Sequence, residues 1–148
     1  MKILDTTKTL TQLTTDTTNG IGQIIPLSCL VTEVLNGEYE AELTVSANDK
    51  YFDQLAVGSL LEIELDAVRG KQIFEIYYIS KPLNEIVSIK AQHITYRLGK
   101  TPVGTFSSTG AAATVNSLLS HIIGTTEFTM TTDIGNTTSN FSLDIPRY

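Results

Sequence analysis

The dipeptide Asn36-Gly37 constrains the fold of this chain more than any other feature, because it stands between two apolar-rich runs. Asn-Gly is the strongest short signal for a two-residue β-hairpin, since both central residues of that turn need a positive φ. The second run alternates, with Tyr39, Ala41 and Leu43 separated by glutamates. That period of two is typical of a half-buried strand. The sequence therefore predicts an antiparallel hairpin with one buried face.

A two-residue turn also predicts the register of the hairpin. The expected cross-strand pairs are Val34 with Tyr39, Thr32 with Ala41, and Leu30 with Leu43. This register places an apolar ladder on one face. It also places Glu33 opposite Glu40, and we expect that face to be solvated or to lie near a cation.

Further short runs predict more strands, at residues 61–65, 73–79 and 86–91, with turns at 69–70 and 81–84. Residues 73–79 are almost wholly apolar and predict a more fully buried strand. We expect one helical turn within 48–55, and two short strands, or a strand and a loop, within 3–25. Short strands separated by Gly, Pro and Asn are typical of an antiparallel barrel or sandwich.

The pattern changes after Gly99. Residues 101–110 are loop-like, and apolar residues then recur at helical spacing at positions 112, 115, 118, 119 and 122. Thr109 is the expected N-terminal cap of this helix, and Gly124 is its expected end. Short strands are expected at 128–132 and 141–145. We therefore predict a mainly β (α+β) protein, with a barrel-like or sandwich-like domain at 1–98 and a strand–helix–strand unit at 99–148.

Composition excludes several classes of function. The net charge is −6 and the basic residues do not cluster, which argues against a nucleic-acid surface. No apolar run approaches the roughly 20 residues of a membrane helix, and the N-terminus does not resemble a secretory signal. Cys29 is the single cysteine, so an internal disulfide is excluded. We expect it to act as a small hydrophobe within the first hairpin strand.

Residues that carry chemistry do not form a recognisable set. His93 and His121 lack metal-ligand spacing, and we expect a hydrogen-bonded structural role for His93 and a surface or interface position for His121. Glu38, Glu40 and Glu42 form a row that fits a solvated strand face better than a metal or glycosidase site. The remaining fragments, Gly20-Ile21-Gly22 and Gly99-Lys100-Thr101, are weak partial matches to nucleotide-binding motifs. We predict no catalytic, cofactor-binding or metal-binding residues, and no enzyme activity for these residues.

Four segments together resemble one family. They are LSCLVTEVLNGEYEAELTV at 27–45, QLAVGSLLEIEL at 54–65, QIFEIYYISKPLNEIVSIKAQHITYRL at 72–98, and the helix followed by FTMTTDI at 128–134. Their order resembles the N-terminal region of the tail-associated structural proteins of phages and prophages of Gram-positive hosts, the prophage tail endopeptidase family. The chain departs from the family pattern at Gln92, where Arg is common, and at Arg97, where Asp is common.

The resemblance implies a structural component of the baseplate hub or tail tip of a virion, made in the bacterial cytoplasm. It implies hub-like β domains, a homotrimer in the full-length protein, and the distal tail and tape measure proteins as partners. Family members are longer, so we expect this chain to end within a second domain. Peptidoglycan-cleaving activity belongs to more C-terminal domains of the family, so it assigns no catalytic residue here. Under this resemblance, we expect His93 and Tyr96 to have a structural role, fixing the point at which the strand leaves the first domain.

Two alternatives to a structural role stay open. One is that the chain is part of a peptidoglycan-degrading tail endopeptidase. The other is a host receptor-binding or carbohydrate-binding module, for which Tyr51, Tyr77 and Tyr78 are the available aromatic residues, since tryptophan is absent. We expect these tyrosines to be core or interface residues.

Overall fold

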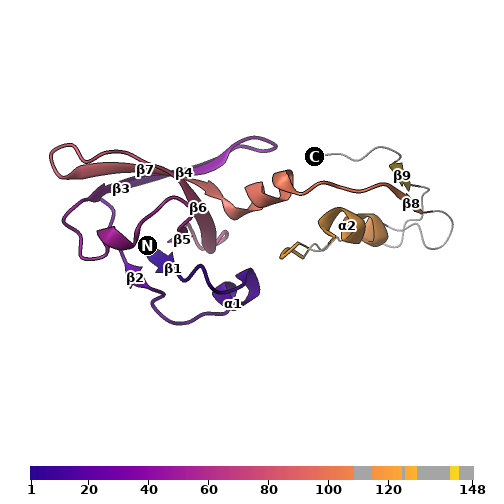
Figure 1. Ribbon diagram of the computed structural model, residues 1–148, viewed down its shortest axis with the longest axis horizontal. Coiled ribbons are helices and arrows are strands. Elements are labelled where there is room, and N and C mark those ends of the chain that lie inside the picture. Colours follow the sequence, from indigo (N-terminus) through magenta and orange to yellow (C-terminus); the bar gives the residue numbers. More distant parts are fainter. Residues whose placement is uncertain (109–114, 125, 130–140, 144–148) are drawn as a thin grey trace. The chain divides into compact units, whose positions relative to one another are not determined.

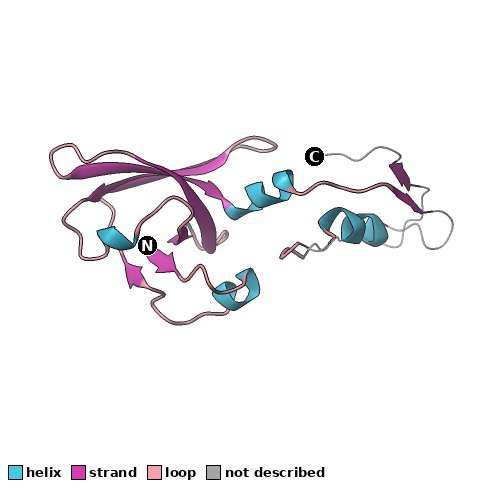
Figure 2. Cartoon of the chain, viewed as in Figure 1, coloured by secondary structure: helices cyan, strands magenta, loops and turns pink. Residues whose placement is uncertain are grey.

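The computed structural model describes residues 1–108, 115–124, 126–129 and 141–143. The chain divides into two compact units, Met1–Ile94 and Thr95–Tyr148. Strands dominate the first unit (Figure 2), which confirms a mainly β fold. None of the helices in the described segments has both the length and the apolar character needed to cross a bilayer.

The first unit is built on one antiparallel sheet of seven strands (Figure 1). The order across the sheet is β2-β1-β5-β6-β7-β4-β3. The strands are β1 (Lys2–Leu4), β2 (Gly22–Gln23), β3 (Ser28–Glu33), β4 (Tyr39–Ser46), β5 (Leu60–Glu64), β6 (Lys71–Ile79) and β7 (Ile86–His93). A short helix, α1 (Leu10–Thr14), lies between β1 and β2, and a 3₁₀ turn, η1 (Phe52–Gln54), lies between β4 and β5.

The sheet has to curl, because its two edge strands are neighbours in sequence. Only residues 24–27 separate β2 from β3, and that linker spans at most about 18 Å. Seven flat strands would hold the two edges about 29 Å apart. Curling brings the edges together, while the hydrogen-bonded order runs open from β2 to β3. Among the described strands, β3 therefore has a partner, β4, on one side only.

The hydrophobic core lies on the concave side of this curled sheet. Phe74 is fully buried, and Ile24, in the linker between the two edges, is buried with it. The same cluster takes residues from five strands and includes Ile3, Ala41, Leu43, Val45, Leu61, Ile63, Ile76, Val87, Ile89 and Ala91. Alternate positions of each strand thus supply the core, as the period of two predicts.

The expected register of the first hairpin is wrong by one residue. Gly37 N donates to Val34 O at 2.9 Å, and Val34 N donates to Glu38 O at 2.8 Å, so the loop has three residues. Asn36 alone takes the positive φ (58°). The observed pairs are Glu33 with Tyr39, Val31 with Ala41, and Cys29 with Leu43. Because the side-chain period is two, this shift moves Leu30 from the expected core face to the outer face.

The tight two-residue turn occurs instead between β6 and β7. Leu83 and Ile86 exchange backbone hydrogen bonds of 2.9 and 3.0 Å around the central residues Asn84 and Glu85. Both central residues have positive φ, 50° and 63°, as a type I′ turn requires. The sequence predicts a turn at 81–84, but Glu85 gives no signal for a left-handed conformation.

Two other features of the first unit differ from expectation. Residues 10–14 form helix α1, begun by a capping box in which Thr9 and Gln12 each accept from the other's backbone N–H. That Thr-x-x-Gln spacing is a readable start signal. Strand β6 has a bulge between Ile76 and Tyr78, so it is not buried along its length. The predicted helical turn within 48–55 and the strands at 61–65 and 86–91 are confirmed.

The second unit contains η2 (Ile94–Lys100, which begins at the unit boundary), β8 (Phe106–Ser108), α2 (Val115–Ile123) and β9 (Phe141–Leu143). Strands β8 and β9 pair antiparallel, so the expected loop at 101–110 contains a strand. Gly124 has a φ of 54° and its N–H bonds to Ser120 O at 3.0 Å, which confirms the helix end. Phe128 and Thr129 are not in a strand, and Thr109, Ala112 and residues 130–132 and 144–145 lie outside the described residues.

Candidate functional site

Several exposed apolar side chains lie along the free edge strand β3 and the residues that flank it. Leu27 and Leu30 are 63% and 62% exposed, and Leu35, at the hairpin tip, is 91% exposed. Val34 and Ile25 are also exposed. Natural sheet edges usually carry charges, Pro or bulges that discourage pairing with another chain. Pro26 precedes β3, but the strand itself contains no Pro and one charged residue, Glu33, so it is a candidate surface for association.

The backbone groups that face away from β4 follow from the hairpin pairing. Val34 N donates to Glu38 O, so groups of residue 34 point toward β4. In an antiparallel ladder the direction alternates along the strand. The N–H and C=O groups of Cys29, Val31 and Glu33 therefore point out of the sheet. Three donors and three acceptors stand along this edge, in the geometry that another strand would match.

The face of the sheet beside this edge is polar. Lys90 Nζ donates to Glu42 Oε1 at 2.6 Å, and Tyr77 OH donates to Glu40 Oε2 at 2.8 Å. The Glu42 hydrogen bond raises the pKa of Lys90, and partial burial together with the Glu40 bond raises the pKa of Tyr77. A depression of about 330 Å³ opens on this face, lined in part by Ser28, Leu30, Thr44 and Ser88. Glu40 thus accepts a hydrogen bond from the Tyr77 hydroxyl, and Glu42 accepts one from the Lys90 ammonium group.

The β6 bulge brings both neighbouring tyrosines to the outside. Tyr78 pairs with Lys90 while Ile76 pairs with Ala91, so Tyr77 is the extra residue. Tyr77 and Tyr78 are 40% and 48% exposed, so the expectation of a buried strand is wrong at this point. Tyr51 is half-buried and packs against the core cluster. A continuous apolar run gives no sign of a bulge, which is why sequence reasoning missed this aromatic pair.

His93 sits in an aromatic environment at the end of β7. Its ring stacks on Tyr39 at 4.2 Å and meets Phe74 edge-on at 5.4 Å. Its Nε2 lies 3.1 Å from Gln72 Oε1. The residue is 7% exposed, and burial lowers its pKa, which favours the neutral ring. These contacts fix the imidazole between strands β4, β6 and β7.

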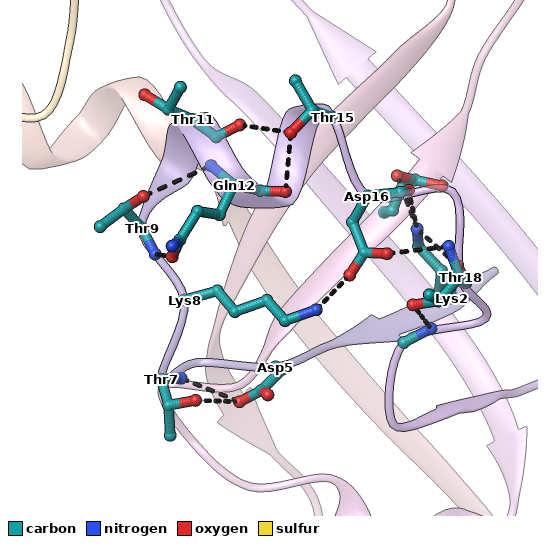
Figure 3. Close-up of polar contacts among 12 residues, drawn as sticks. Lys2, Asp5, Thr7, Lys8, Thr9, Thr11, Gln12, Thr15, Asp16 and Thr18 are labelled. Atoms are coloured by element: carbon teal, nitrogen blue, oxygen red, sulfur yellow. Dashed lines mark hydrogen bonds and ion pairs between the residues drawn. The ribbon is translucent and has the colours of Figure 1, made fainter.

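An ionic cluster ties the N-terminal segment to the sheet (Figure 3). The Lys2 ammonium, 8% exposed, lies 3.3 Å from Glu62 Oε2 and donates to the carbonyls of Asp16 and Thr18 at 3.3 and 3.2 Å. Lys8 Nζ bonds to Asp16 Oδ2 at 2.5 Å, and this bond holds the pKa of Asp16 far below its usual range. A cavity of about 240 Å³ adjoins Lys2 and Glu62. The cluster closes the 15–20 loop onto β1 and β5.

The other candidates take structural positions. Cys29 lies within β3, the first hairpin strand, as expected, and it is exposed there. His121 on α2 is half-buried, with Nε2 3.3 Å from Gly104 O. Gly22 lies against the Tyr51 ring, and Gly99 lies near the end of η2. Over the described parts of the chain, no three His, Cys, Asp or Glu side chains gather closely enough to hold a metal ion.

Only part of this surface is readable from sequence. The hairpin and its alternation locate β3, but edge position depends on which strands pair at long range.

Comparison of the chain with family models, with curated proteins and with solved structures gave no match.

Proposed function

We propose that this chain is a structural module of a phage or prophage tail tip or baseplate hub, and that it acts by assembling with other tail subunits. The family resemblance of the segments at 27–45, 54–65 and 72–98 supports the tail assignment. The structural observation that carries an assembly role is the β3 edge, which presents unpaired backbone groups and exposed apolar side chains together. A hub built from β domains needs such surfaces to join its subunits.

The proposed partners are the distal tail protein and the tape measure protein. The proposed full-length form is a homotrimer, whose ring contacts are heterologous and use different patches on neighbouring subunits.

Electron microscopy of intact tails tests this function. A gold-labelled antibody raised against residues 1–94 should mark the tail tip in purified virions of the parent phage or in induced prophage particles. The same antibody absorbed with the purified protein is the control. Labelling along the shaft or on the head would contradict the proposal.

A carbohydrate-binding or host receptor-binding role is a second candidate, favoured by the exposed pair Tyr77 and Tyr78 beside Glu40. Aromatic faces with nearby hydrogen-bonding groups suit the binding of sugar rings. A glycan array with host cell-wall polysaccharides should then give binding that Tyr78→Ala removes. The control is Tyr51→Phe, because the ring of Tyr51 packs against the core cluster and the variant keeps that ring. Its binding should equal that of the unmodified protein. Equal signals from Tyr78→Ala and the unmodified protein would exclude this role for the tyrosine pair.

A further inference from the structure

We propose that β3 pairs antiparallel with β3 of a second copy of this chain, with Val31 opposite Val31 on a twofold axis. The inference stands on the geometry of the edge and goes beyond the proposed tail function. The outward N–H and C=O groups of Cys29, Val31 and Glu33 alternate as in any antiparallel ladder, so their natural complement is an extended strand. A second β3 supplies the same pattern in reverse.

The register follows from satisfying all of these groups. With Val31 at the axis, Cys29 lies opposite Glu33 of the second copy, and the two edges form six backbone hydrogen bonds. If the axis lay at Leu30, Glu33 would fall opposite Leu27. If it lay at Thr32, Cys29 would fall opposite Leu35. In both cases an outward-facing residue would be paired with a residue beyond β3. In the first case that residue is Leu27, whose N–H already bonds to Thr44 O at 2.7 Å. The Val31 axis alone uses every outward group of the strand.

The side chains agree with this register. Leu27 and Leu35, both well exposed, lie just beyond the two ends of β3, so this register brings Leu27 of one copy near Leu35 of the other. On the outer face, Val34 falls opposite Ser28, beside the 330 Å³ depression that Ser28 and Leu30 help to line. Pairing therefore removes apolar surface from water on both faces of the strand.

Charge does not oppose the pairing. The only charged residue of β3 is Glu33, and Arg69 Nε lies 3.1 Å from its carboxylate within the same chain. In the proposed register Glu33 faces Cys29, so two carboxylates do not meet across the axis. A like-charge pair directly opposite would disfavour association.

The symmetry of the contact separates it from ring assembly. A twofold contact is isologous and gives a dimer, whereas a cyclic trimer needs heterologous contacts. Both inferences use the β3 edge, but the dilution series tests the twofold contact and the labelling of tails tests the tail function, so their failures are distinguishable.

Light scattering coupled to size exclusion, run over a dilution series, measures the dimer. Val31→Pro removes one outward N–H and adds bulk on the edge, and it leaves the bonds to β4 in place. We expect it to raise the dimer dissociation constant at least tenfold. Val31→Ala keeps the N–H and controls for lost packing.

A second pair of variants covers the case in which the proline change unfolds the protein. Leu35→Lys should weaken the dimer, because it places a charge near the apolar side chain of Leu27 of the second copy. Leu83→Lys is the matched control, since Leu83 is 75% exposed in the turn between β6 and β7, and β4 lies between β7 and β3 in the sheet. It should leave the dissociation constant unchanged.

Disulfide cross-linking tests the register. Glu33→Cys in the presence of native Cys29 should give a covalent dimer on mild oxidation, because paired strand residues lie within disulfide range. Glu38→Cys, exposed beyond the hairpin loop, should give none. Two results would overturn the inference. One is a chain that stays monomeric at every concentration. The other is an oligomer, trimeric or otherwise, that is unchanged by both Val31→Pro and Leu35→Lys and that gives no cross-link in the Glu33→Cys variant.

Discussion

Replacing Glu85 with glycine should stabilise the first unit, although it removes a side chain. Glu85 is the second central residue of the turn between Leu83 and Ile86, with a φ of 63°. The left-handed conformation costs a residue with a Cβ about 1–2 kcal/mol. Glycine avoids that strain but loses about 0.4–1 kcal/mol through the greater freedom of its unfolded chain.

The net gain is about 0.5–1 kcal/mol in the free energy of unfolding, because the other contact of Glu85 is unaffected. That contact is its carbonyl, which accepts from Ala47 N at 2.8 Å and is a backbone group. For a unit of this size the gain corresponds to a rise in Tm of about 2–8 °C. Urea denaturation and thermal melting followed by circular dichroism both measure it.

Glu64→Gly is the matched control, since Glu64 is an exposed glutamate in a β-strand rather than a left-handed turn. Glycine there should destabilise the protein by about 0.5–1 kcal/mol. If Glu85→Gly lowers stability as Glu64→Gly does, the turn is not left-handed and the reasoning fails.

Three further changes test other parts of the first unit. Gly22→Ala should lower stability by about 1–3 kcal/mol in urea melts, because its Cβ would lie 2.4 Å from a Tyr51 ring carbon; an unchanged midpoint would mean that the ring moves freely. Lys2→Met should cost about 1–3 kcal/mol, because it leaves two carbonyls without their donor and Glu62 without one of its two lysines; a stabilised variant would contradict this. Burial lowers the pKa of His93 in the folded protein. As the pH falls below the usual histidine pKa, His93 therefore binds a proton in the unfolded chain before it does so in the folded protein. Stability should therefore fall from pH 7 toward pH 5, and His93→Gln should flatten that fall; an identical slope in both proteins would exclude His93 as its source.

The sequence predicts much of the local structure because the signals are local. Alternation locates β4 and β5, and Gly124 ends α2 as its position suggests. The capping box at Thr9 is an equally local signal, but the expectation of strands or a loop within 3–25 overlooked it, and α1 was not predicted. These features depend on residues within about four positions of one another, so composition and spacing carry them.

Local signals do not specify the candidate association surface. The loop at Asn36 takes three residues rather than two, and this single-residue difference turns Leu30 outward and Val31 inward. The bulge that exposes Tyr77 lies in a uniformly apolar run. Sequence alternation is compatible with either register of β3 on β4, and the hydrogen bonds that close the three-residue loop set the observed one.

Short antiparallel strands with alternating faces follow from the amino-acid sequence alone, because backbone geometry and side-chain periodicity act over a few residues. The position of β3 at an edge of a curled seven-stranded sheet, with its outward backbone groups unpaired, emerges only from the folded arrangement. Strand order depends on hydrogen bonds and core packing between segments tens of residues apart, and no short run of residues encodes those long-range pairings.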